Sequence, residues 1–63
     1  MKVWTTEQAR SLRKKRAALQ LTQTEACQVI GIGEKSLRKL EAGKATVKKS
    51  LYLRVLEWLA QDD

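Results

Sequence analysis

The sequence has no histidine, no proline and one cysteine, and these absences exclude several classes of protein. Cys27 alone cannot form a disulfide within the chain, and one thiol without histidine cannot build a tetrahedral zinc site. An enzyme is the weakest expectation, because no histidine can activate a nucleophile and no phosphate-binding loop is present. No apolar run approaches the ~20 residues of a membrane span, and the start is not that of a signal peptide. A free thiol without an export signal indicates a cytoplasmic protein.

Glycine-rich linkers, repeats and low-complexity segments are also absent, so we expect residues 1–63 to form a single domain. A domain of this length buries only about 60% of its unfolded surface, which leaves its stability marginal. Since disulfides and metals are excluded as supplements, a second protein chain becomes the natural source of further buried surface.

Acidic residues are scarce where basic residues are concentrated. The chain carries 13 lysines and arginines against 7 acids, a net charge of +6. Between Arg10 and Lys49 there are 11 basic residues and three acids, a local excess of eight. Such a field on a small body favours a polyanionic partner, with nucleic acid first and an anionic membrane second. The alternative is a basic surface that is merely solvated.

Four segments have the apolar spacing of helices. The first begins after Thr5, which forms a predicted capping box with Gln8, and its apolar stripe holds Ala9, Leu12 and Leu19. The second begins after Thr22, with a glutamate three residues further on. It covers Gln23 to Ile30, and its inward-facing residues are Ala26, Cys27 and Ile30.

Gly31 is expected to end the second helix with a positive φ. The third helix follows at once, from Glu34 to Ala42, with Leu37, Leu40 and Glu41 facing inward. The last runs from about Ser50 to Ala60. Two short helices joined by a glycine turn (about residues 22–42) and covered by other helices predict an all-α helix-turn-helix domain of four or five helices.

The segment RAALQLTQTEACQVIGIGEKSLRKLEAGK resembles the helix-turn-helix of the lambdoid phage repressor and Cro proteins, the XRE family. The resemblance extends from about Leu12 to Leu59. The matching positions are Arg16, Leu21, Thr22, Gln23, Glu25, Gly31, Leu37, Leu40, Glu41 and Gly43. Gln20 departs from the pattern, because family members often have glycine there. Cys27 replaces a small alanine and is expected to act as a buried apolar residue.

This resemblance implies a transcriptional regulator, repressor or Cro-like, whose third helix enters the major groove of double-stranded DNA. The positions that it places nearest base edges are Glu34, Lys35, Ser36, Arg38 and Lys39, with Arg38 at an edge or on phosphate. The positions that it places on phosphates are Thr22, Gln23, Lys44, Lys48 and Lys49.

Two charges lie on helix faces that should be apolar. Arg16 follows Leu12 by one turn, and Glu41 follows Leu37 by one turn. Because an unpaired buried charge is costly, we expect the two to meet as an ion pair, which similar proteins also carry. The alternative is that each reaches water independently.

The last helix is apolar over roughly 220° of its circumference, whereas one core contact needs only about 100°. Leu51, Val55 and Leu59 are its expected core stripe. The residues left over for a homodimer or partner interface are Leu53, Leu56, Ala60 and Trp58. The segment KVWT could extend that interface as a strand or an apolar flap.

Two alternatives to a plain DNA-binding regulator stay open. An antitoxin-type or adaptor protein would bind operator DNA and also bind a cognate toxin or other protein through its last helix. An RNA-binding protein is less favoured, because the aromatic residues lie in apolar segments and form no stacking platform.

Overall fold

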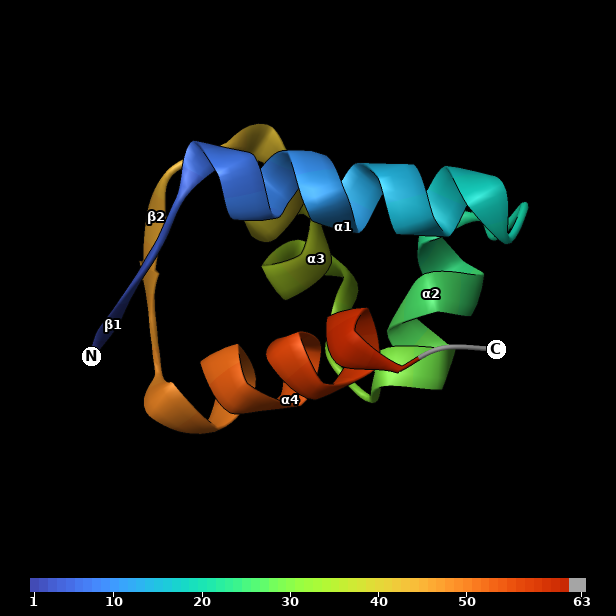
Figure 1. The fold of residues 1–63 in the computed structure, drawn as a ribbon. Helices are drawn as coiled ribbons and strands as arrows, with labels where there is room; N and C mark the ends of the chain where they lie inside the picture. The colour runs from blue at the N-terminus through green and yellow to red at the C-terminus, as the bar shows by residue number, and fades with distance from the viewer. Residues whose placement is uncertain (62–63) are drawn as a thin grey trace.

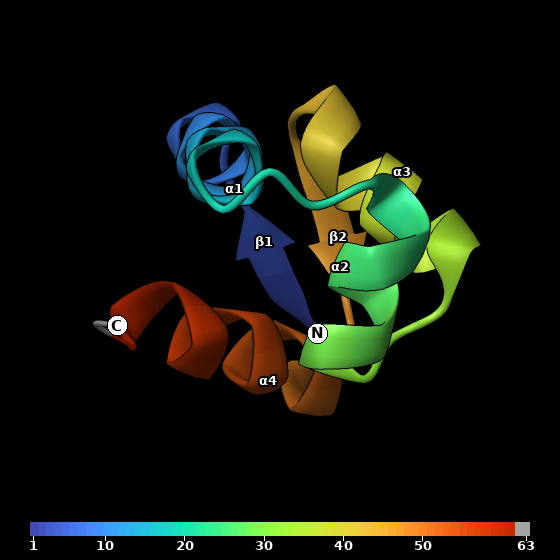
Figure 2. The same ribbon diagram turned by 90° about the vertical axis from the view of Figure 1, so that its right-hand side faces the viewer.

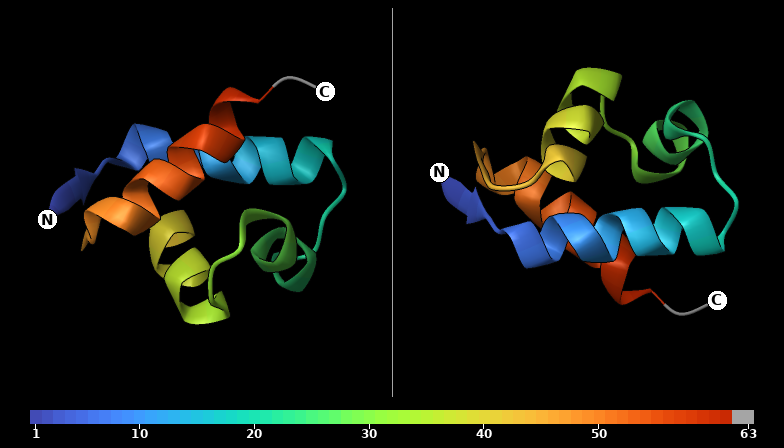
Figure 3. Two further views of the ribbon diagram at one scale, coloured as in Figure 1. Left: turned by 90° about the horizontal axis from the view of Figure 1, so that it is seen from below. Right: turned by 90° about the horizontal axis from the view of Figure 1, so that it is seen from above.

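The computed structural model describes residues 1–61. Its elements in chain order are β1 (Lys2–Trp4), α1 (Thr6–Ala18), α2 (Gln23–Ile30), α3 (Glu34–Ala42), β2 (Ala45–Val47) and α4 (Lys49–Ala60). Helices α1 and α4 lie at opposite edges of the molecule in Figure 1, with α2 and α3 between them. Seen from above or below, α1 and α4 lie on one side and α2 and α3 on the other (Figure 3). The four predicted helices are therefore present, and the molecule has the predicted helix-turn-helix fold.

Local hydrogen bonds explain where α1 and α2 begin. The Thr5 hydroxyl accepts from the Gln8 backbone N–H, and the Gln8 side chain accepts from the Thr5 N–H. Thr22 and Glu25 repeat this arrangement at the start of α2, and the bond from the Thr22 N–H holds the pKa of Glu25 below its ordinary value. Each box satisfies two backbone donors that the first helical turn leaves free, so both predicted capping boxes are confirmed.

The core lies where the four helices meet. Helix α3 packs on both α1 and α2, and α4 contacts α1, α2 and β1. The side chains with no exposed surface are Trp4, Ala9, Leu12, Ala26, Leu37, Leu40 and Val55. The inward-facing residues predicted for the second and third helices, Glu41 included, are all buried. One continuous cluster therefore joins the first helix to the last.

A two-stranded antiparallel sheet is an addition to the four helices. β1 pairs with β2 in the register Lys2–Val47, Val3–Thr46 and Trp4–Ala45. Figure 2 shows the two strands side by side between α1 and α4. Of the two alternatives for KVWT, a strand or an apolar flap at an interface, the structure has a strand, over Lys2–Trp4. Trp4 is nevertheless unavailable for an interface, because its side chain is fully buried in the core.

Trp58 was expected at an interface, and the structure contradicts this. Its side chain is only 5% exposed, because α4 turns Val55 and Trp58 together toward the core while Leu51 and Leu59 are only partly buried. The Lys15 ammonium lies 4.7 Å from the centre of the Trp58 ring. Lys15 also donates to the backbone carbonyls of Trp58 and Gln61, which places a cation at the negative end of the α4 dipole.

The end of α1 also differs from expectation. Leu19 was expected on the core stripe, but the helix ends at Ala18, and Leu19 is 37% exposed as its C-cap. The next residue, Gln20, has a φ of 57°, in the left-handed region. Its N–H bonds the Ala17 carbonyl and the Leu21 N–H bonds the Arg16 carbonyl, the pattern of a Schellman motif. Gln20 occupies the position where this motif prefers glycine.

We expect Gln20→Gly to stabilise the protein by about 0.5–1 kcal/mol, because glycine relieves the left-handed strain at some cost in chain entropy. The measurement is urea unfolding followed by circular dichroism. Gln28→Gly is the matched control, since Gln28 is exposed inside α2. That change should destabilise the protein by about 1 kcal/mol. A destabilisation by both variants would contradict the role assigned to Gln20.

Candidate nucleic-acid interface

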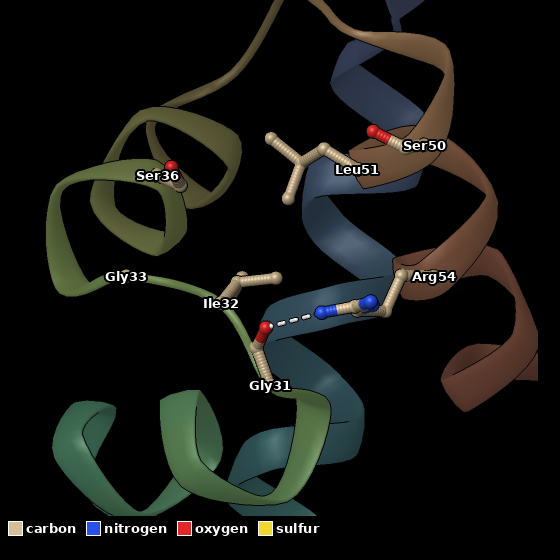
Figure 4. Close-up of a pocket in the computed structure, with 7 residues that line it drawn as sticks. All are labelled: Gly31, Ile32, Gly33, Ser36, Ser50, Leu51 and Arg54. Carbon is tan, nitrogen blue, oxygen red and sulfur yellow. Dashed lines mark hydrogen bonds between the residues drawn. The ribbon is translucent and has the colours of Figure 1, made fainter.

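The turn between α2 and α3 consists of Gly31, Ile32 and Gly33. Gly31 has a φ of 85°, as expected of a glycine that ends a helix, and its N–H bonds the Cys27 carbonyl at 2.8 Å. The Arg54 guanidinium of α4 donates to the Gly31 carbonyl at 2.8 Å (Figure 4). The turn is therefore held by a side chain of α4 as well as by the two helices that it connects.

Helix α3 has one buried face and one exposed face. Its buried face, Leu37, Leu40 and Glu41, packs into the core. The residues expected near base edges lie on the other side, where Glu34, Lys35, Arg38 and Lys39 are exposed and Ser36 is half-buried. Within residues 1–61, none of the three cations on this face forms an ion pair.

Two of these side chains already have partners in the chain. The Glu34 carboxylate accepts from the Thr24 hydroxyl at 2.7 Å, a contact that links α3 to α2. The Lys39 ammonium donates to the Thr46 carbonyl at 3.3 Å. The sequence alone did not reveal Thr24 or Thr46, because neither contact follows from helical spacing. Lys35 and Arg38 are the cations left to extend away from the surface.

The positions expected on phosphates lie at helix ends, except for Lys44, which is exposed between Gly43 and β2. Thr22 caps α2. The Gln23 side chain donates to Glu41 at 3.1 Å, and its backbone N–H lies in the first turn of α2, where helix donors have no partner within the helix. Lys48 is the N-cap of α4 and Lys49 its first residue, and both are exposed. Cations at the positive end of a helix dipole are unfavourable unless an anion binds there.

Arg16 and Glu41 meet across the helix-turn-helix. Arg16 Nε lies 2.6 Å from Glu41 Oε2, and Arg16 Nη2 lies 3.2 Å from the other carboxylate oxygen. The remaining Arg16 nitrogen donates to the Leu21 carbonyl at 3.1 Å. The side chains are 24% and 7% exposed, respectively. This bidentate pair joins α1 to the inner face of α3, and the bond to Leu21 joins α1 to the residues that precede α2. Together these contacts fix the orientation of α3 relative to α1.

Cys27 has no exposed reactive thiol. Its side chain is 6% exposed, and burial raises the pKa of the Cys27 thiol above its ordinary value. A protonated, buried thiol behaves as a small apolar residue. Within residues 1–61, no helix is both long and apolar enough to cross a membrane.

A short helix capped by Thr22, a glycine turn and a second helix with an exposed basic face define a helix-turn-helix protein. The comparison with family models agrees: the model described as Helix-turn-helix matches residues 12–57. The chain belongs to this family, in its XRE-type branch of DNA-binding proteins. Comparisons with curated proteins and with solved structures gave no match.

Proposed function

We propose that this protein is a small transcriptional regulator that binds specific double-stranded DNA sites in the cytoplasm, in the manner of a repressor or Cro protein. One observation carries the proposal: α3 is held by a buried face and an ion pair, while its opposite face presents cations that form no ion pair within the described residues. A helix presented in this way can enter the major groove, whose base edges distinguish all four base pairs.

Within this proposal the basic residues divide into two groups. The side chains of α3, above all Lys35 and Arg38, reach base edges. Lys44, Lys48 and Lys49 lie beyond the end of α3 and meet phosphates on one side, while the N-terminus of α2 meets them on the other. Guanine, with two acceptors in the major groove, is the base that lysine and arginine read most often. A half-site containing guanine is therefore expected.

The proposal is tested by selecting bound duplexes from a random pool and by footprinting the DNA upstream of the protein's own gene. We expect one enriched sequence, protected at nanomolar protein concentration and arranged as a palindrome. Binding to every duplex with one affinity would contradict sequence-specific regulation.

A symmetric dimer is part of the proposal. Leu53 is 46% exposed, Ala60 is exposed and Leu56 is half-buried, so one side of α4 presents apolar surface away from the core. A two-fold contact on this surface would cover it and would place two copies of α3 about 34–36 Å apart, one turn of DNA.

We expect Leu53→Glu to convert the dimer to a monomer, because it places a charge at the centre of the contact. Sedimentation at micromolar concentration measures this. Val29→Glu is the matched control, since Val29 is 59% exposed on α2, and it should leave the dimer intact. If the parent chain sediments as a 7.2 kDa species, the homodimer is excluded.

The same apolar surface supports the second candidate function, an antitoxin-type or adaptor protein. In that case the side of α4 around Leu53 would bind a cognate toxin or other protein. A second protein that co-purifies with the parent chain and is lost from Leu53→Glu would favour this function over the plain regulator.

A further inference from the structure

The segment that connects α3 to α4 carries two of the three lysines assigned to phosphates, and the third, Lys49, directly follows it as the first residue of α4. This segment is not held by those helices alone. It contains β2, and β2 is paired along its whole length with β1 at the other end of the sequence. Lys44 immediately precedes β2, and Lys48 immediately follows it. The spacing between these two lysines is therefore set by the strand that β1 holds in place.

Trp4 is the residue that fixes β1 to the helices. Its side chain is fully buried, and its indole N–H donates to the Leu40 carbonyl at 2.8 Å. Leu40 lies in the last turn of α3, where helix carbonyls lack a partner within the helix. The Trp4 ring also packs edge-on against Tyr52 of α4, with 6.1 Å between ring centres. One side chain thus joins β1 to α3 and α4, and β1 pairs with β2 through its backbone.

The paired strands lie against the surface assigned to DNA. An open groove is lined by Ser36 and Lys39 of α3, by Thr46 and Val47 of β2, and by Met1, Lys48 and Leu51. Lys39 crosses from α3 to the Thr46 carbonyl. The face that carries the proposed base contacts and the segment that carries the phosphate contacts therefore form one continuous surface, and β1 supports it at its edge.

The connection between α3 and α4 begins at Gly43, whose φ of 138° lies outside the helical region. Without β1, the strand β2 in this connection would have no partner strand. DNA would then have to order the connection on binding, at a cost in conformational entropy. We infer that β1, through Trp4, is a positioning element of the DNA interface that holds Lys44, Lys48 and Lys49 in place for the phosphate backbone. This inference rests on the proposed function.

Trp4→Phe tests it, because phenylalanine keeps an aromatic ring and loses the indole N–H. Trp58→Phe is the matched control: it makes the same change at the other buried tryptophan, whose ring packs against Lys15 of α1. Both proteins are measured on the selected duplex and on random duplex over a range of salt concentrations, at temperatures where both are folded. The slope of log affinity against log salt counts phosphate contacts at about 0.9 per contact.

We expect Trp4→Phe to lower the slope by about 1–2, equivalent to one or two lost phosphate contacts, and to weaken both duplexes by the same factor. Backbone amide exchange should become faster at residues 44–49 in the free variant, while α3 is unchanged. Trp58→Phe should keep the parent slope. Val3→Gly, which loosens the strand at a half-exposed position without touching the core, should resemble Trp4→Phe.

A parent-like slope in both Trp4→Phe and Val3→Gly would overturn the inference while leaving the proposed function intact. An equal loss of slope in Trp58→Phe would also overturn it, since the effect would then follow from stability alone. A parent chain that binds no duplex would overturn the proposed function, and the positioning role with it.

Discussion

Arg16→Met is expected to lower the free energy of unfolding by about 3 kcal/mol, because it leaves the Glu41 carboxylate buried without its cation. Glu41 is 7% exposed, and Gln23 would be its remaining side-chain donor. The estimate is at the lower end for a broken buried pair because Arg16 itself is 24% exposed. For a domain of this size it is a large share of the total stability. Urea unfolding measures the difference.

Two further variants distinguish the loss of the ion pair from the general effects of removing a charge or changing a side chain's packing. Arg13→Met removes an exposed arginine from the same helix and should change stability by no more than about 0.5 kcal/mol. Arg16→Met combined with Glu41→Met should be more stable than Arg16→Met alone, because no buried carboxylate is then stranded. The pairing would be energetically unimportant if Arg16→Met matched the parent chain.

Lys35→Ala and Lys48→Ala should affect DNA binding in different ways. Lys35 extends from the exposed face of α3, so its loss should relax the preference at particular base pairs by about 1–3 kcal/mol. Lys48 lies at the start of α4, where it faces backbone phosphate in the proposed complex. Its loss should weaken specific and random duplexes by the same factor and lower the salt slope by about 0.9. Competition binding over a range of salt concentrations measures both quantities.

Lys14→Ala is the control for charge, because it removes the same charge from the exposed side of α1. It should change neither the base preference nor the salt slope by as much as the other two variants. If Lys35→Ala and Lys48→Ala weakened specific and random DNA identically, the division between base and phosphate contacts would be wrong.

The starts of the first two helices and the end of the second could be predicted from the sequence because their causes are local. Thr5 with Gln8 and Thr22 with Glu25 satisfy backbone groups only three residues away, and Gly31 takes a conformation that its own lack of a side chain allows. The inner face of α3 could also be predicted from the sequence, since a periodicity of 3.6 residues places Leu37, Leu40 and Glu41 on one side of the helix. The family resemblance rests on these same positions.

Tertiary structure decided what depends on contacts between distant residues. Two β-branched residues within Ala45–Val47 are too short a pattern to predict a strand, and this strand is formed by its pairing with Lys2–Trp4. The wheel of the last helix shows an apolar arc but not which part of it is covered. Trp58 is buried because α1, with Lys15, packs against that part of α4. Burial depends on the neighbours that a helix meets, and the sequence of the helix alone does not contain them.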